Sequence, residues 1–162
     1  MNTKNRRLTL ADLKNPVNFI TLGFGSGLSK YAPGTMGTLV AVPIYLLLQP
    51  LPLLYYIAIA VGVSLVGIWL CDYTAKRLGV HDHPGIVWDE IAGYLLTMVA
   101  APAGWQWIVL GFCLFRLFDI WKPWPIKVID HKVGGGFGIM LDDIVAALFA
   151  WGILQLVALL VL

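Results

Sequence analysis

The stretch IAGYLLTMVAAPAGWQWIVLGFCLF, residues 91–115, carries no charged side chain and is interrupted by Ala101-Pro102-Ala103-Gly104. A helix of about 20 apolar residues crosses a bilayer. These 25 residues can therefore cross once with tilt, or form a short hairpin that does not fully cross twice. Proline removes a backbone donor and disfavours helix in the residue before it. The break favours the hairpin, with a single crossing as the alternative.

Charge elsewhere in the chain is confined to three blocks. All 11 basic and 9 acidic side chains lie within residues 4–30, 72–90 and 116–143. The uncharged stretch 31–71 has 41 residues, enough to cross a membrane twice, and Gln49-Pro50-Leu51-Pro52 is a natural reversal. The last 19 residues are apolar enough for one further transmembrane helix.

The composition indicates an integral membrane protein. Hydrophobic residues make up 59% of the chain and charged residues 12%, against about 25% charged in soluble domains. We expect one all-α membrane-embedded domain over 1–162, with four to five hydrophobic segments and a polar N-terminal tail at 1–14. That tail has no apolar core of the kind found in secretory signal peptides. A net charge of +2 does not support a nucleic-acid partner, and no obligate protein partner is indicated.

The distribution of basic residues predicts the topology. Lysine or arginine occurs in each charged block, and such residues are enriched on the cytoplasmic side of membrane proteins. With a hairpin at 91–115, all three blocks lie on that side. A single crossing would instead place 72–90 and 116–143 on opposite sides.

Two pairs of adjacent acids are the strongest candidates for chemistry. Asp89-Glu90 and Asp142-Asp143 each come directly before an apolar run, where first-turn acids stabilise a helix by about 0.3–1 kcal/mol. Capping is therefore one interpretation. Four carboxylates brought together repel one another unless a cation lies between them, and such oxygen ligands suit magnesium or manganese. We predict that at least two of the four bind a metal ion.

A basic helix end follows in FRLFDIWKPWPIKVID, residues 115–130. Arg116, Asp119 and Lys122 are spaced by three, so they can form ion pairs along one helix surface. One interpretation is an interfacial anchor, with the two tryptophans at headgroup depth. The other is a phosphate site formed by Arg116 and Lys122, with Asp119 as a further metal ligand.

Two weaker candidates remain. The glycine-rich stretch GFGSGLSKYAPGTMGTL, residues 23–39, fits neither a dinucleotide fingerprint nor a Walker A loop. Thr35 and Thr38 can still contribute to a phosphate cradle at a helix start, although close helix packing explains the small residues equally well. His81 and Asp82 are possible site-lining residues, because His-Asp pairs occur in metal phosphohydrolases.

The four motifs GFGSGLSKYAPGTMGTL, HDHPGIVWDEIAG, FRLFDIWKPWPIK and GGGFGIMLDDIVA, in this order and spacing, resemble the bacterial phosphatidylglycerophosphatase A family. The resemblance runs from about Asn15 to the C-terminus, with a small difference at Lys30-Tyr31. It implies an all-α, multi-pass protein of the bacterial inner membrane whose active site faces the cytoplasm. It also implies Mg²⁺-dependent hydrolysis of phosphatidylglycerophosphate to phosphatidylglycerol and phosphate.

The resemblance implies that the two acid pairs belong to motifs of the active region, with Asp119 and Lys122 in the third motif. Catalytic roles are expected for Asp89, Glu90, Asp142 and Asp143, and metal binding for these four and Asp119. Lys122, Arg116, Thr35 and Thr38 are expected at the phosphate. The alternatives are a divalent-cation transporter, another membrane lipid-phosphate hydrolase, or a structural membrane subunit. A transporter would carry acids near mid-membrane, whereas these lie at the ends of apolar stretches.

Overall fold

The computed structural model describes residues 7–162 and is helical throughout, with no strand in that range. The expected all-α class is therefore confirmed. The elements are the short 3₁₀ helices η2 (Leu10–Lys14) and η3 (Gly23–Leu28), and the α-helices α1 (Pro16–Thr21), α2 (Pro33–Leu48), α3 (Leu53–Leu78), α4 (Trp88–Thr97), α5 (Trp105–Trp121), α6 (Ile126–Lys132) and α7 (Gly135–Val161).

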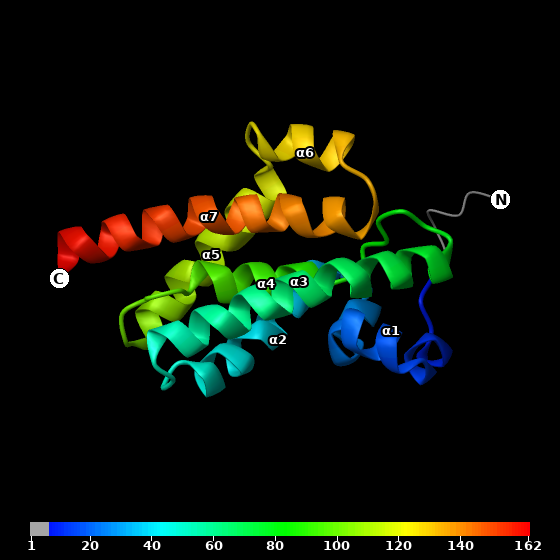
Figure 1. The fold of residues 1–162 in the computed structure, drawn as a ribbon, viewed down its shortest axis with the longest axis horizontal. Helices are drawn as coiled ribbons and strands as arrows, with labels where there is room; N and C mark the ends of the chain where they lie inside the picture. Colours follow the sequence, from blue (N-terminus) through cyan, green and yellow to red (C-terminus); the bar gives the residue numbers. More distant parts are fainter. Residues whose placement is uncertain (1–6) are drawn as a thin grey trace.

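Helix α4 lies at the centre of the bundle and packs against α2, α3, α5 and α7 (Figure 1). Its buried residues Ile91, Tyr94 and Leu95 belong to the main hydrophobic core. Two tyrosine hydroxyls within this core donate to backbone carbonyls: Tyr94 to Ile108 at 3.1 Å, and Tyr56 of α3 to Leu95 at 2.7 Å. The central helix is thus held by apolar contact and by these two hydrogen bonds.

Within residues 7–162, two helices are long and apolar enough to cross a membrane. They are α3, with 26 residues, and α7, with 27. Helices α2 and α5 are shorter, with 16 and 17 residues, and α4 has only 10. At about 1.5 Å per residue, α4 is roughly 15 Å long, half the thickness of a hydrocarbon core.

The broken hairpin at 91–115 is present. Helix α4 ends at Thr97 and α5 begins at Trp105. The chain reverses between them, so that α5 returns toward the end of the bundle where α4 begins (Figure 1). The carbonyl of Val99, exposed by the break, accepts from Trp151 Nε1 at 3.0 Å and from Gln155 Nε2 at 2.9 Å. Two donors on α7 therefore replace the helical hydrogen bond that the turn removes.

The described parts of all three charged blocks, from residue 7 onward, lie at one end of the bundle. The starts of α4 and α7 and the ends of α3 and α5 meet there (Figure 1). The two helix reversals, at 49–52 and 98–104, lie together at the other end, where they line a common pocket. The hairpin thus brings the two acid pairs to the same end.

One expectation needs correction. The second acid pair is not in a first turn, because α7 already begins at Gly135 and Asp142 is seven residues further on. The glycines before it form helix instead of loop because α7 packs closely on α3: a Cβ on Gly136 would collide with the carbonyl of Ile68. In the polar tail, Leu10–Lys14 forms η2, and residues 1–6 lie outside the described part.

Candidate active site

The first turn of α4 is held in place by contacts from two other elements. The amide of Val87 donates to the carbonyl of Thr21 at 3.1 Å, and the indole of Trp88 donates to the carbonyl of Val63 at 3.1 Å. These bonds fix the residues that come directly before Asp89 and Glu90. The two acids therefore have a defined position at the end of the central helix.

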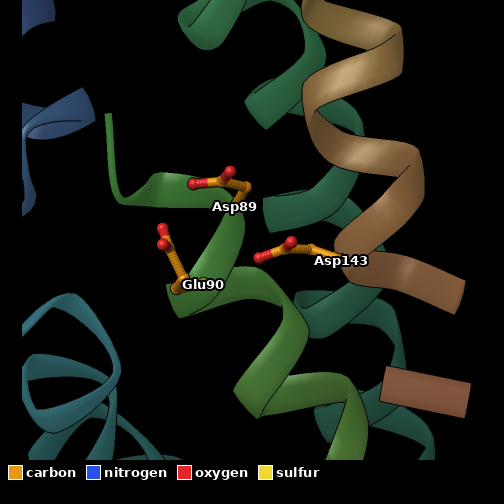
Figure 2. A group of neighbouring side chains, drawn as sticks. All are labelled: Asp89, Glu90 and Asp143. Carbon is orange, nitrogen blue, oxygen red and sulfur yellow. The ribbon is translucent and has the colours of Figure 1, made fainter. Parts of the chain in front are cut away.

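Asp89, Glu90 and Asp143 form a carboxylate triad between α4 and α7 (Figure 2). Each offers one oxygen, and these oxygens all lie within 4.8 Å of one another. Asp89 is 8% exposed and Asp143 only 3%. Within the described chain, this is the one group of three such side chains with the spacing of a metal site.

The triad has unsatisfied oxygens. Asp89 Oδ1, Glu90 Oε2 and Asp143 Oδ2 are buried and have no hydrogen-bond partner among the described residues. An uncompensated buried carboxylate costs several kcal/mol, and three in one place repel one another as well. A divalent cation with oxygen preference relieves both costs, and magnesium typically takes one or two carboxylates together with water and substrate oxygens. The donor set therefore fits such an ion.

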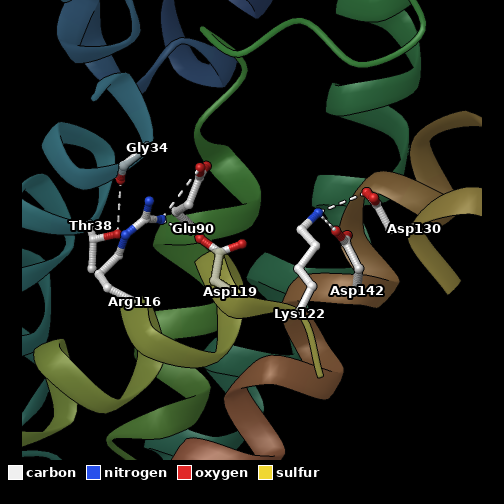
Figure 3. A network of polar contacts seen from close by, with 8 residues as sticks. All are labelled: Gly34, Thr38, Glu90, Arg116, Asp119, Lys122, Asp130 and Asp142. Carbon is white, nitrogen blue, oxygen red and sulfur yellow. Dashed lines mark hydrogen bonds and ion pairs between the residues drawn. The ribbon is translucent and has the colours of Figure 1, made fainter. Parts of the chain in front are cut away.

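Arg116 lies beside the triad. Its Nη1 is 3.7 Å from Glu90 Oε1 and also pairs with Asp119, whereas its Nε is buried without a partner in the described chain (Figure 3). The guanidinium packs against Gly34 at the start of α2, where a Cβ would collide with Glu90 Oε1. Glycine at this position thus lets the helix start approach the ion pair closely.

Lys122 is the second cation at the site. It ends α5 in a left-handed backbone conformation, with φ 47°, and donates to Asp130 and Asp142, each at 2.7 Å (Figure 3). Burial alone would lower the pKa of Lys122, but the two hydrogen bonds outweigh it and hold the pKa above its ordinary value. The ammonium is therefore firmly protonated and has one N–H left to donate.

The five predicted metal ligands fall into two groups. Asp89, Glu90 and Asp143 form the triad, whereas Asp119 and Asp142 are bound to Arg116 and Lys122 respectively. An Asp119–Lys122 pair is not formed, because the left-handed conformation of Lys122 directs its side chain away from the surface of α5 and toward α7.

The two threonines predicted to bind phosphate, Thr35 and Thr38, lie near this site but differ in whether their hydroxyls can bind a ligand. Thr38 is fully buried, and its hydroxyl donates to the carbonyl of Gly34 at 2.9 Å, so this hydroxyl has no free proton for phosphate. Thr35 is partly exposed in the first turn of α2. Small residues here serve close helix packing at least as much as an anion cradle.

His81 and Asp82 lie at the edge of the candidate active site. His81 Nε2 accepts from the amide of Gly135 at 2.8 Å, and a residue that sequence reasoning missed, Asp72, accepts from Gly136 at 3.2 Å. These two acceptors cap α7, whose own N-cap residue is a glycine. Asp82 lines a pocket of about 490 Å³ with Asp130, another residue missed from the sequence. Asp130 is eight residues beyond Lys122, across a proline turn, and no local pattern links them.

Known proteins match the part of the chain that contains these site residues. The family profile of phosphatidylglycerophosphatase A matches residues 19–158. The chain is 49% identical over 147 residues to phosphatidylglycerophosphatase A of Escherichia coli K12, covering 90% of this chain and 85% of that protein. It is 44% identical over 150 residues to the protein of the same name from Haemophilus influenzae, covering 91% and 92%.

A third relative, from Bacteroides thetaiotaomicron, is 37% identical over 140 residues, covering 82% of this chain and 87% of that protein. It bears the provisional name of a phosphatidylinositol-3-phosphatase. No solved structure matches the chain significantly. The match over most of the chain, with the carboxylate triad inside it, shows that this chain belongs to the phosphatidylglycerophosphatase A family and is a phosphatase.

Proposed function

We propose that this protein hydrolyses the terminal phosphomonoester of phosphatidylglycerophosphate, giving phosphatidylglycerol and inorganic phosphate. The observation that carries the proposal is the buried carboxylate triad with unpaired oxygens, flanked by two cations that each retain a free donor. The relatives named for this activity support the choice of substrate.

We infer that Mg²⁺ binds at Asp89, Glu90 and Asp143. The fit rests on the three buried oxygens that lack a partner in the described chain, and on the preference of magnesium for oxygen ligands. When bound there, the ion would supply Lewis-acid polarisation of a phosphate oxygen and a lowered pKa for a coordinated water.

The protein's own cations would orient the phosphate. Arg116 has its Nε free, and Lys122 has one N–H left after its bonds to Asp130 and Asp142. Charge-assisted hydrogen bonds from these donors would hold two phosphate oxygens and stabilise the charge that develops on them. Because both cations are already held by carboxylates, little reorganisation is needed when the phosphate arrives.

We assign the proton-accepting role to Asp119. It lies outside the triad, pairs with Arg116, and is close enough to Asp143 for the two carboxyl groups to interact electrostatically. A carboxylate in this position can take a proton from a water that attacks phosphorus, provided that the water lies within hydrogen-bond reach. Asp142, the other acid outside the triad, is bound to Lys122 instead.

We further propose that the protein spans the bacterial inner membrane several times with the site facing the cytoplasm. The two long apolar helices support membrane association. The charged end of the bundle carries the described lysines and arginines of all three blocks, which favours the cytoplasmic side for that end.

A second candidate substrate is a phosphoinositide monophosphate. The relative named as a phosphatidylinositol-3-phosphatase supports it, because that lipid also carries a phosphomonoester beyond a phosphodiester. A cation transporter is disfavoured, since the triad lies at the end of the central helix and the apolar segment from 144 onward carries no acid.

The proposal is tested by phosphate release from purified protein. Phosphatidylglycerophosphate and phosphatidylinositol 3-phosphate are compared in mixed micelles, with magnesium and with EDTA. We expect magnesium-dependent release that is faster from phosphatidylglycerophosphate and is abolished by Asp143→Asn, whereas Asp12→Asn, a distant change of equal charge, retains it. Release that is equal in EDTA would count against the metal site, and metal uptake into vesicles without phosphate release would favour transport.

A further inference from the structure

Two polar pockets flank the active site and have opposite charge. The acidic one contains Asp82 and Asp130 and is lined by neither lysine nor arginine. The basic one is lined by Arg7 and Lys30 and by no carboxylate. At about 680 Å³, the basic pocket lies in the range of small-ligand sites, roughly 300–1,000 Å³.

The basic pocket adjoins the active site on two sides. On one side its wall is Pro33, and the next residue, Gly34, packs against Glu90 and Arg116. On the other side the wall is the loop through Gly85, which leads within four residues to Asp89. The walls of the pocket therefore continue directly into residues of the active site.

Both cations of the pocket are available. Neither Arg7 nor Lys30 forms an ion pair within residues 7–162, and the side chain of Lys30 lies over the ring of Tyr31 at 5.5 Å. Ser29 adds a hydroxyl, which donates to the carbonyl of Tyr31 at 2.8 Å and keeps its lone pairs free. Tyr31 is 76% exposed, which suits an aromatic residue at headgroup depth.

We infer that this pocket binds the phosphodiester of the lipid substrate while the triad holds the terminal phosphomonoester. The inference rests on the proposed function and deepens it. A phosphodiester carries one negative charge, so it is attracted by Arg7 and Lys30 and repelled from the neighbouring acidic pocket, with which the basic pocket shares Pro84. In phosphatidylglycerophosphate a three-carbon spacer joins the two phosphates, and Pro33 of the pocket directly precedes Gly34, which packs against Glu90 of the triad.

The consequence is specificity for lipids with two phosphates. Phosphatidic acid carries only a phosphomonoester attached directly to its diacylglycerol, so it can reach the triad but leaves Arg7 and Lys30 without a ligand. Binding at a non-reacting group then contributes to positioning the reacting phosphate. The basic pocket therefore selects phosphatidylglycerophosphate over phosphatidic acid.

The test compares these two lipids in full-length protein carrying Arg7→Gln and Lys30→Gln together. We expect kcat/KM for phosphatidylglycerophosphate to fall about tenfold, mainly through KM, and that for phosphatidic acid to change less than about twofold. Lys30→Arg alone should retain the wild-type preference. The matched control, Lys127→Gln with Lys132→Gln on α6, removes the same charge outside the pocket and should leave both substrates unaffected.

Two results would overturn the inference: an unchanged preference in the double variant, or an equal loss for both lipids. A binding measurement separates this outcome from failure of the proposed function. In EDTA, retention of each lipid is measured by native mass spectrometry without turnover. If the double variant, and no other variant, fails to retain phosphatidylglycerophosphate, the pocket is supported even when wild-type protein releases no phosphate. Equal retention of this lipid by all variants refutes the pocket.

Discussion

Asp142 and Asp143 are adjacent on α7, yet they have different partners: Asp142 accepts from Lys122 at 2.7 Å, and Asp143 joins Asp89 and Glu90 in the triad. Successive helical residues point about 100° apart, so one acid faces the end of α5 while the other faces α4. The two adjacent acids therefore belong to two different parts of the active site. Substitutions at the two positions should consequently have different effects.

Asp143→Asn should lose magnesium binding, and Asp142→Asn should keep it. Removing Asp143 takes one charged ligand from the triad, so kcat should fall about 100-fold or more, roughly 2.7 kcal/mol in transition-state stabilisation. Asp142→Asn should lower activity through Lys122 while magnesium still raises the thermal unfolding temperature. Thermal unfolding with and without magnesium measures this difference. Equal loss of the magnesium effect in both variants would show that Asp142 is a ligand too.

Lys122→Met should reduce both stability and activity, for separable reasons. It leaves Asp142, which is 5% exposed, without its hydrogen-bonded cation, at a cost of about 1–3 kcal/mol. Because the side chain of Lys122 is itself 26% exposed, the lower part of that range is expected. Adding Asp142→Asn removes the unpaired charge and should restore most of the stability but none of the activity. Recovery of phosphate release in the double variant would contradict a role for Lys122 at the phosphate.

Gly136→Ala and Gly152→Ala should change stability in opposite directions, although both lie in α7. A Cβ at Gly136 collides with the carbonyl of Ile68, so overpacking should destabilise the protein by at least about 1–3 kcal/mol. Nothing lies within 4 Å of a Cβ at Gly152, where alanine should stabilise the helix by about 0.5–1 kcal/mol. Thermal unfolding in detergent checks both, and a neutral Gly136→Ala would show that α3 and α7 can separate slightly.

The turns of this fold could be predicted from the sequence because prolines fix them locally. Reversals at 49–52 and 101–104, and the end of α5 before Pro123, follow from the missing amide and the steric restriction that proline imposes. The start of α7 could not be predicted in the same way. Its run of glycines is typical of a loop, and only the close approach of Ile68 and Asp72 explains why it is helical.

The sequence predicted which residue types form the candidate site, but only partly which side chains contact one another there. Adjacent acids indicated a cation, but which acid of each pair faces the triad depends on how α4, α5 and α7 are rotated against one another. Asp130 and Asp72 contribute through tertiary contacts that span 8 and 64 residues along the chain. No repeating pattern in the sequence predicts contacts of this kind.

Labelling of introduced cysteines tests the hairpin on which the single-site arrangement depends. Ala103 lies in the turn between α4 and α5, at the opposite end of the bundle from Lys132 on α6 (Figure 1). In cells with the two native cysteines replaced by alanine, an impermeant maleimide should label Ala103→Cys from the periplasmic side. Lys132→Cys should react only after the membrane is opened.

The two positions together determine the outcome. The triad combines acids from α4 and α7 and is flanked by the end of α5, so the charged ends of these helices must share one side of the membrane. Labelling of both cysteines from the same side would show that the turn between α4 and α5 does not reach the opposite face of the membrane. Labelling of Lys132→Cys from the periplasm and Ala103→Cys from the cytoplasm would keep the hairpin but invert it, and the active site would then face outward.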